Sequence, residues 1–294
     1  MPEFYHSSKK FRYSALVLVP LVMAIFSSIL GLLYSIILVT IPVSTIYIGI
    51  IASLLWGLGA YYCSGWSIKI THLRNEPLAV FLGLIGAAVG FYVSWAGWVS
   101  LNVVATKYRF GEFVISFFDF ECLKYFLLHP QDLWDTVKLI NVDGTWLIKK
   151  MQVKGGILWV IWGLEALFYL IIVIIFFSNK AGIPYCEEIQ TWLSKMKLKN
   201  NLVLVPTNPQ DCIRLLSRIE NGDIGYFLQN PETFLKGMGS YLELELFTAD
   251  GAPDSCVTVT YHHFEKNKEK TSKVLLNKMY VPYVQAENLS NTLS

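Results

Sequence analysis

Glu165 is the residue of this sequence best placed to do chemistry inside a membrane. It lies near the centre of the apolar stretch GILWVIWGLEALFYLIIVIIFF at 156–177. Carboxyl groups inside membrane helices are rare and often belong to proton or ion pathways, and insertion of an Asp at the helix centre costs about 2.5–3.5 kcal/mol. Two interpretations stay open: Glu165 relays a proton or cation, or it is a protonated acid that hydrogen-bonds to a neighbouring helix and helps to orient its own.

The other apolar segments offer few polar partners for Glu165. No Lys, Arg, Asp or second Glu lies deep in another predicted span, whereas a proton relay normally uses a chain of such groups. This shortage favours the structural interpretation. The residues available for an intramembrane polar site are Tyr34, Tyr61, Tyr62, Ser94 and Asn102.

The remaining reactive residues form no recognisable catalytic pattern. The sequence has no Gly-rich phosphate loop, H-E-x-x-H or G-x-S-x-G motif. His262 and His263 are adjacent in a predicted strand, so they point to opposite faces and cannot share a metal. No C-x-x-C pair occurs, so we expect neither a disulfide framework nor a metal site, no cofactor and no enzymatic activity. The cysteines are Cys63, Cys122, Cys186, Cys212 and Cys256.

Composition divides the chain into a membrane part and a soluble part. Hydrophobic residues make up 54% of the 294 residues and charged residues only 16%, against about 25% charged in an average soluble domain. Residues 13–104 carry almost no charge, whereas 180–294 resemble soluble protein. From Lys180 onward, 12 Lys or Arg accompany 13 Asp or Glu, a balance that offers no electrostatic footprint for nucleic acid.

The apolar segments predict four membrane spans, because about 20 apolar residues cross a bilayer core roughly 30 Å thick. We expect the spans at 13–38, 43–68, 78–104 and 155–178, after a basic N-terminal segment at 1–12. Residues 105–154 form an interfacial helical insertion, whose Phe-rich part lies at the bilayer surface or packs on the bundle. The expected fold is therefore a membrane all-α four-helix transmembrane bundle at 13–179, followed by a small soluble α+β domain.

The soluble domain at 180–294 has short strand and helix patterns. A strand is expected at 201–205, a helix at 209–222, a hairpin at 240–264 and a third strand at 273–284, with frayed residues after it. Basic residues flanking the spans number six on the side of the termini and five on the other. The positive-inside rule therefore gives almost no preference for either orientation in the membrane. The unpaired cysteines favour cytoplasmic termini.

Small residues recur along one face of each of the first three spans. Such stripes let helix backbones approach closely where no hydrophobic effect drives association, so they favour tight packing within the bundle, with self-association through 78–104 as the alternative. They are Gly83, Gly86, Gly90, Ser94 and Gly97; Gly49, Ser53, Gly57, Ala60 and Ser64; and Ser27, Gly31 and Ser35.

Tryptophans gather near the ends of the third and fourth spans. An interfacial aromatic belt is the favoured interpretation over a ligand cage. These residues are Trp95, Trp98, Trp146, Trp159 and Trp162.

Four segments resemble an uncharacterised family of bacterial four-span membrane proteins. They are THLRNEPLAVFLGLIGAAVGFYVSWAGWV, NVDGTWLI, LWVIWGLEALF and IPYCEEIQTWL, and the resemblance covers most of residues 1–195. Members tend to carry P-F-C-E-x-C-x-x-W after the last span, which suggests a metal or redox knuckle. Cys186 and Trp192 match that pattern but Ile189 replaces the second cysteine, so only a vestigial knuckle is implied here.

The leading functional hypothesis is a non-enzymatic protein of the bacterial inner membrane that anchors or scaffolds a protein partner through its cytosolic C-terminal domain. The alternative is a small transporter or proton-coupled membrane component centred on Glu165. The expected partners are the lipid bilayer, a protein bound to the soluble domain and, if the small stripe is exposed, a second copy of the chain, but not nucleic acid.

Overall fold

The computed structural model describes residues 2–40, 45–103, 107–110, 113–116, 119–144, 146–148, 151–196, 198, 202–206, 208–229, 240–265 and 268–293. It contains two compact units. One consists of Met1–Ser8 together with Ile183–Ser294, and the other of Lys9–Gly182. The first holds a β-sheet with covering helices and the second is mainly helical, so the coarse prediction of a helical part followed by an α+β part is confirmed.

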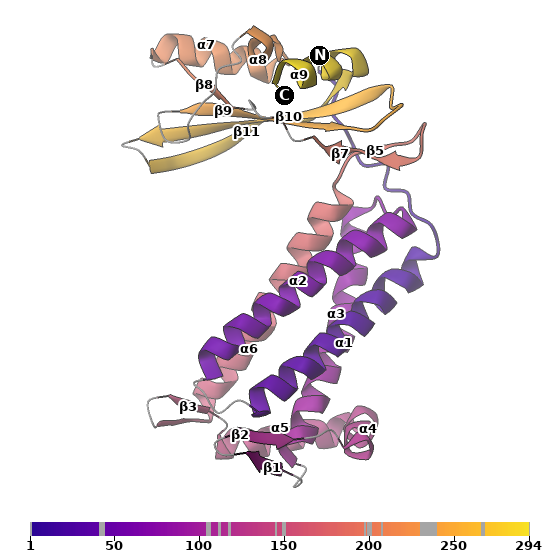
Figure 1. Cartoon of the computed structure of the whole chain (residues 1–294), viewed down its shortest axis with the longest axis vertical. Coiled ribbons are helices and arrows are strands. Elements are labelled where there is room, and N and C mark those ends of the chain that lie inside the picture. Colours follow the sequence, from indigo (N-terminus) through magenta and orange to yellow (C-terminus); the bar gives the residue numbers. More distant parts are fainter. Residues whose placement is uncertain are drawn as a thin grey trace. The chain divides into compact units, whose positions relative to one another are not determined.

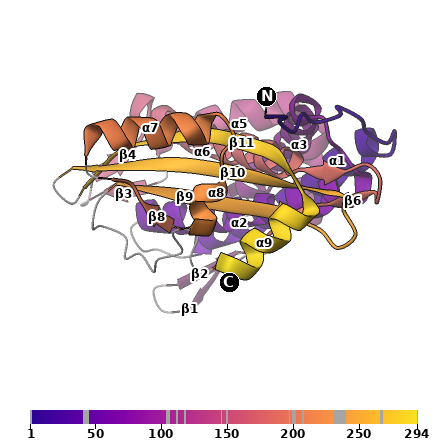
Figure 2. The same ribbon diagram turned by 90° about the horizontal axis from the view of Figure 1, so that it is seen from above.

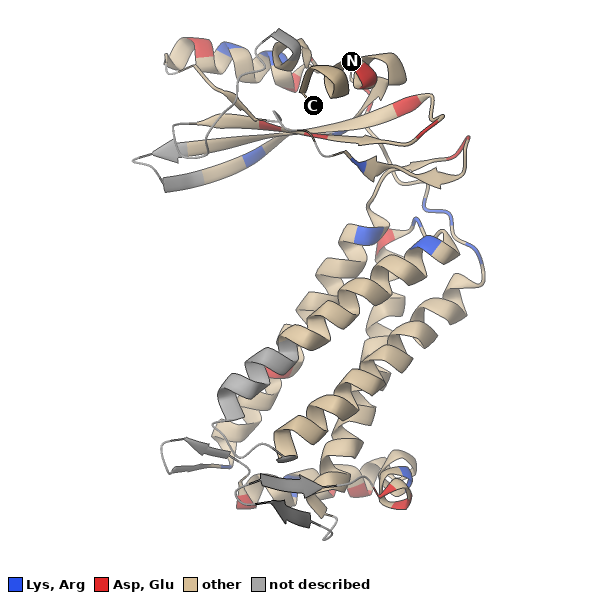
Figure 3. Cartoon of the chain, viewed as in Figure 1, with Lys and Arg blue, Asp and Glu red and all other residues tan. Residues whose placement is uncertain are grey.

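Long helices dominate the helical unit (Figure 1). They are α1 (Ala15–Thr40), α2 (Thr45–Thr71), α3 (Glu76–Val103) and α6 (Gly156–Ala181). Their bounds lie within three residues of the predicted spans. Within the described part of the chain, α1, α3 and α6 are long and apolar enough to cross a membrane, which indicates a membrane protein. Charged residues gather towards the ends of these helices (Figure 3).

One end of the bundle brings together three segments that are distant in sequence. The backbone N–H of Arg74, between α2 and α3, donates to the Lys10 carbonyl ahead of α1 at 3.0 Å. The Ser178 hydroxyl near the end of α6 donates to the Glu76 carboxylate at the start of α3. The start of α1, the α2–α3 connector and the end of α6 therefore lie at the same end of the bundle.

The insertion at the other end packs on the bundle. It contains α4 (Phe120–Leu128) and α5 (Pro130–Asp143), preceded by the hairpin β1 (Lys107–Phe110)–β2 (Phe113–Ser116) and followed by the hairpin β3 (Trp146–Ile148)–β4 (Met151–Val153). A helical insertion was predicted here, but neither hairpin was. Asp119 caps α4, because its side chain accepts the N–H groups of Glu121 and Cys122. The insertion shares a core with α3 and α6 that includes Leu123, Phe126, Leu133, Val137, Trp98, Val99, Leu158 and Trp162.

The sheet unit is built on an antiparallel sheet of order β11-β10-β9-β7, with β8 also paired to β9. Two long hairpin strands and a third strand were predicted, and their alternation sets the register: Leu246 lies opposite Val257 and Leu244 opposite Val259. A separate hairpin joins β5 (Tyr185–Cys186) to β6 (Thr191–Trp192). The sheet strands are β7 (Ser194–Lys195), β8 (Leu202–Leu204), β9 (Tyr241–Thr248), β10 (Asp254–Glu265) and β11 (Lys268–Pro282).

Three helices cover one face of this sheet: α7 (Pro209–Glu220), α8 (Gly225–Gln229) and α9 (Tyr283–Leu293) (Figures 1 and 2). The prediction of frayed residues at the C-terminus was wrong. Residues from Tyr283 onward form α9, which buries Ala286, Leu289 and Leu293 in the main core of the unit. Their spacing of three and four places all three side chains on one helical face.

The N-terminal residues belong to the sheet unit. Phe4 forms an antiparallel bridge with Met279 on β11, and the Tyr280 N–H donates to the Glu3 carbonyl at 2.8 Å. The basic segment predicted at 1–12 is therefore divided: its first residues extend the sheet edge, and Lys9–Arg12 lead into α1.

Candidate functional site

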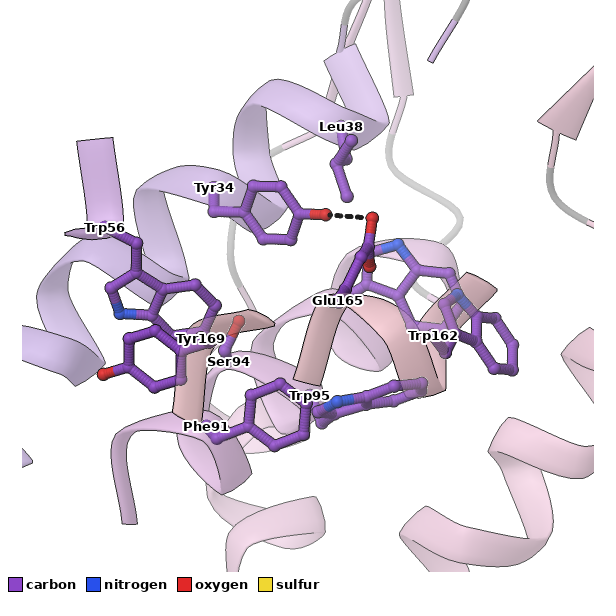
Figure 4. Close-up of a pocket in the computed structure, with 10 residues that line it drawn as sticks. Tyr34, Leu38, Trp56, Phe91, Ser94, Trp95, Trp162, Glu165 and Tyr169 are labelled. Atoms are coloured by element: carbon purple, nitrogen blue, oxygen red, sulfur yellow. Dashed lines mark hydrogen bonds between the residues drawn. The ribbon is translucent and has the colours of Figure 1, made fainter. Parts of the chain in front are cut away.

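A cavity of about 40 Å³ lies in the helical unit and is walled by α1, α2, α3 and α6. Seven of its ten lining residues are aromatic, and the single ionisable carboxyl among them belongs to Glu165 (Figure 4). The lining residues are Tyr34, Leu38, Trp56, Phe91, Ser94, Trp95, Trp98, Trp162, Glu165 and Tyr169.

The carboxyl of Glu165 has one weak hydrogen bond. The Tyr34 hydroxyl donates to its Oε1 atom at 3.3 Å (Figure 4), which is longer than the usual 2.7–2.8 Å of an O–H···O bond. Among the described residues, no other group hydrogen-bonds to this carboxyl or forms an ion pair with it. Glu165 is only partly buried by the protein. The predicted hydrogen bond between Glu165 and a neighbouring helix is thus present, but it leaves most of the capacity of the carboxyl unused.

Close contact between α1 and α3 brings Tyr34 to this position. A Cβ atom built on Gly90 would lie 2.1 Å from the Cβ of Ser27, and one on Gly86 would lie 2.5 Å from the Pro20 carbonyl oxygen. The two helix backbones therefore touch along the predicted small stripe, as glycine permits. Ser94 strengthens the contact, because its hydroxyl donates to the Gly31 carbonyl of α1 at 3.1 Å.

Contacts of α6 set the rotation of that helix. The hydroxyls of Tyr169 and Ser27 share a hydrogen bond of 2.6 Å, and the Tyr169 ring stacks on Trp56 with ring centroids 4.3 Å apart. About two turns further along α6, Gly83 of α3 makes room for the buried Phe177 ring, whose nearest atom would lie 2.7 Å from an added Cβ. Because Tyr169 and Glu165 are four residues apart, fixing Tyr169 also directs Glu165 into the bundle.

The structure brings together some predicted polar-site residues and not others. Tyr34 and Ser94 line the cavity with Glu165. Tyr61 lies elsewhere, with the Lys180 ammonium 4.0 Å from its ring centroid. The Asn102 amide donates to the Trp98 carbonyl of its own helix.

The predicted packing glycines are buried where they are described. Gly83, Gly86, Gly90, Gly97 and Gly57 are buried, and a Cβ on Gly57 would meet Ile172 of α6 at 3.3 Å. The surroundings of Gly49 lie outside the described residues.

Three aromatic lining residues, Tyr169, Trp56 and Phe91, were not predicted from the sequence. Tyr169 carried a usable signal, since it shares a helical face with Glu165 at i+4. Trp56 and Phe91 carried none, because their approach to Glu165 depends on how α2 and α3 pack against α6.

The tryptophans predicted as an interfacial belt form a packed cluster. Trp95 and Trp162 meet edge to face with centroids 5.0 Å apart, and Trp162 also contacts Trp98 at 5.7 Å and Trp159 at 5.2 Å. Trp98 and Trp162 are 9% and 7% exposed, so these rings fill the space between α3 and α6. The side chain of Trp146 lies outside the described residues.

The vestigial knuckle is an aromatic hairpin. Cys186 lies opposite Thr191, and the Tyr185 ring meets the Trp192 ring edge to face at 5.1 Å. Ile189, which replaces the second cysteine, packs on a small apolar cluster around Leu193. In the described part of the chain, no group of three or more His, Cys, Asp or Glu residues is arranged to hold a metal ion.

The adjacent histidines have separate partners, in keeping with their positions on a strand. His262 stacks on Tyr241 at 4.6 Å and contacts the Glu243 carboxylate through Nε2 at 3.1 Å. His263 instead meets the Ser240 hydroxyl at 3.1 Å.

Comparison of the chain with protein-family models, curated proteins and solved structures gave no match. The function is therefore inferred from the geometry of this site.

Proposed function

We propose that this protein is a small transporter or proton-coupled component of a membrane, in which Glu165 exchanges a proton for a cation. One observation carries the proposal: the Glu165 carboxyl faces an aromatic-lined cavity with a single 3.3 Å hydrogen bond and no ion pair among the described residues. A carboxyl that served packing alone would be expected to have its hydrogen-bonding capacity filled, because an unsatisfied polar group is costly in an apolar environment.

The residues around the Glu165 carboxyl suit a bound cation. Aromatic faces attract cations through their quadrupoles, and an ionised carboxylate would supply the counter-charge. The cavity can hold a water molecule as well, since about 10–15 Å³ suffices for one water and the cavity measures about 40 Å³. Water or a small cationic group could therefore reach the carboxyl and accept or replace its proton.

In this proposal α2 is the fourth span, and the bundle is an up-and-down arrangement in the bacterial inner membrane with both termini in the cytoplasm. The length of α2, 27 residues, and the gathering of the α1 start, the α2–α3 connector and the α6 end support an even number of crossings. Exposed Asn291 and Asp143 provide the test, each replaced by Cys after Cys122, Cys186 and Cys212 are changed to Ser. A membrane-impermeant thiol reagent should label intact cells at position 143 but not at 291, and the reverse pattern would contradict the orientation.

The direct test of the function is whether Glu165 changes its protonation in the membrane-embedded protein. Infrared difference spectra across the neutral pH range should show a carboxyl band that is lost in Glu165→Gln and retained in Glu76→Gln. Glu76 is a matched control, since it lies at the bundle end with a hydroxyl donor. The packing role would be established instead by two results together. The infrared band would show Glu165 protonated at every pH, and the Glu165→Gln protein, inserted at wild-type levels, would be fully active.

Anchoring of a protein partner remains the second candidate, and one feature of the sheet unit favours it. The sheet face opposite α7, α8 and α9 bears the apolar side chains of Leu204 and Val274, which are 41% and 52% exposed. Pull-downs from native membranes should recover a partner with the intact chain and lose it in Leu204→Asp and Val274→Asp. An unchanged set of captured proteins would argue against docking on this face.

A further inference from the structure

Next to the Glu165 cavity lies a larger apolar groove between α3, α5 and α6. It has a volume of about 400 Å³, within the range of about 300–1,000 Å³ typical of small-molecule sites. Helix α5 contributes Leu133, Trp134 and Val137, and α6 contributes Gly163 and Ala166. Nothing lies within 4 Å of a Cβ built on Gly163, so this glycine opens the floor of the groove.

The groove has almost no polar chemistry of its own. The hydroxyl in its lining belongs to Tyr92 and already donates to the Phe126 and Leu127 carbonyls at 3.0 and 3.1 Å. Its walls belong to α3 and α6, two helices of membrane-spanning length. An aliphatic chain is therefore the chemistry that the groove fits, and the surrounding lipid phase can deliver one.

Groove and cavity share a wall. The wall consists of residues that line both spaces: Phe91, Trp95 and Trp162. Within this wall the Trp95 and Trp162 rings meet edge to face. Displacement of one of these rings joins the two spaces, so a molecule with an apolar chain in the groove can place its head group beside Glu165.

Charge and size restrict that head group. The carboxyl without an ion pair and the aromatic faces around it select a cation. The cavity of about 40 Å³ has room for only a few waters at about 10–15 Å³ each, so it suits a head group of similar size. A primary ammonium is close to water in size and has three donors for the carboxylate and neighbouring hydroxyls, whereas a trimethylammonium group is several times larger.

We propose that the site binds a lipophilic primary amine, with its nitrogen beside Glu165 and its chain in the groove between α3, α5 and α6. The inference rests on the proposed function and names the ligand class of the same site. The neutral amine enters from the lipid phase, and its nitrogen lone pair takes the proton of the Glu165 carboxylic acid. An ammonium–carboxylate pair results, and release to water returns the ligand as an ammonium ion once the carboxylate is reprotonated.

Dodecylamine is the probe, with dodecyltrimethylammonium and dodecanol as matched ligands of equal chain length. Binding to the full-length protein in lipid nanodiscs is measured from the fluorescence of the tryptophan cluster, with empty nanodiscs as the blank for partitioning. We expect dodecylamine to bind at least about tenfold more tightly than either other ligand, a difference of about 1.4 kcal/mol. Equal binding of the trimethylammonium compound would overturn the size argument, and equal binding of the alcohol would overturn the role of charge.

Two variants test the two parts of the site separately. Glu165→Gln should weaken dodecylamine binding at least about tenfold, because the ammonium loses its counter-charge. Gly163→Leu should do the same by filling the groove, while the infrared titration of Glu165 stays intact. Gly156→Leu is the control, since Gly156 also lies on α6 with nothing within 4 Å of its Cβ position but does not line the groove.

The outcomes separate this inference from the proposed function. If Glu165 titrates normally but Gly163→Leu binds dodecylamine like Gly156→Leu, the groove is not the chain site and the inference fails alone. If Glu165 does not titrate, and dodecylamine changes the tryptophan fluorescence no more than partitioning into empty nanodiscs explains, both proposals fail.

Discussion

Gly90→Ala probes the contact on which the site is built. The added Cβ would lie 2.1 Å from the Ser27 Cβ, 2.9 Å from the Ser27 carbonyl carbon and 3.0 Å from its Cα, whereas ordinary contacts begin near 3.4 Å. None of these atoms moves when the Ser27 side chain rotates, so α1 and α3 must separate by about 1.3 Å, the difference between 3.4 and 2.1 Å. That shift also strains the Ser27–Tyr169 hydrogen bond.

The expected cost follows from overpacking. Forcing an extra group into a packed interface typically destabilises a protein by about 1–3 kcal/mol, and a lost membrane hydrogen bond adds about 0.6 kcal/mol. The higher helix propensity of alanine opposes this by roughly 1 kcal/mol. Gly163→Ala is the matched control, because nothing lies within 4 Å of its Cβ and its propensity gain is the same. Gly90→Ala should therefore be less stable than Gly163→Ala by about 1–3 kcal/mol.

Unfolding of the purified variants by dodecyl sulfate in mixed micelles, followed by tryptophan fluorescence, measures this difference. Ser27→Gly in the Gly90→Ala background should recover much of the loss, since it removes the nearest opposing atom, and a double-mutant cycle isolates the coupling. Equal stability of Gly90→Ala and Gly163→Ala, with unchanged oligomeric state, would refute the reasoning and place this face of α3 against lipid.

Two further predictions concern the sheet unit. Leu289→Ala on α9 should destabilise the unit by about 2–5 kcal/mol, because the Leu289 side chain is fully buried. Chemical unfolding of the full chain measures this loss. A change below about 0.5 kcal/mol, as for an exposed site, would show that α9 is not docked on the sheet. Burial raises the pKa of the Cys256 thiol to about 12, so its thiolate is scarce and alkylation at pH 8 should be slow until the chain is unfolded. The raised pKa also means that the stabilisation from the neutral thiol is present below its unfolded pKa and is lost as the pH rises towards about 12. Rapid alkylation of Cys256 in the native protein, read by mass spectrometry, would contradict its burial.

Much of the helical unit was predictable because its signals are local. Runs of apolar residues set the lengths of α1, α3 and α6, and the recurrence of Gly86 and Gly90 identified the face on which α1 packs. The predicted hydrogen bond of Glu165 to a neighbouring helix is also present. The four-span topology and the functional role of Glu165 stay predictions.

Elements whose stability comes from distant partners were missed or misassigned. The residues of α9 looked frayed because a short amphipathic segment gains its stability from the sheet it covers. Phe4 gave no strand signal, since its extended conformation depends on the edge of β11. The tryptophans were expected to face the membrane interface, yet Trp98 and Trp162 are buried against each other.

Length, polarity and small-residue spacing are properties of a single segment, so they could be read along the chain, as could the one carboxyl near the centre of an apolar segment. Tyr34, Trp56, Phe91 and Tyr169 surround this carboxyl, and a groove floored by Gly163 adjoins it, only because the folded helices bring these residues together. No single segment of the chain contains such a cavity. Its walls come from helices whose rotations are set by close contacts that Gly31, Gly83, Gly86 and Gly90 make with residues distant in sequence.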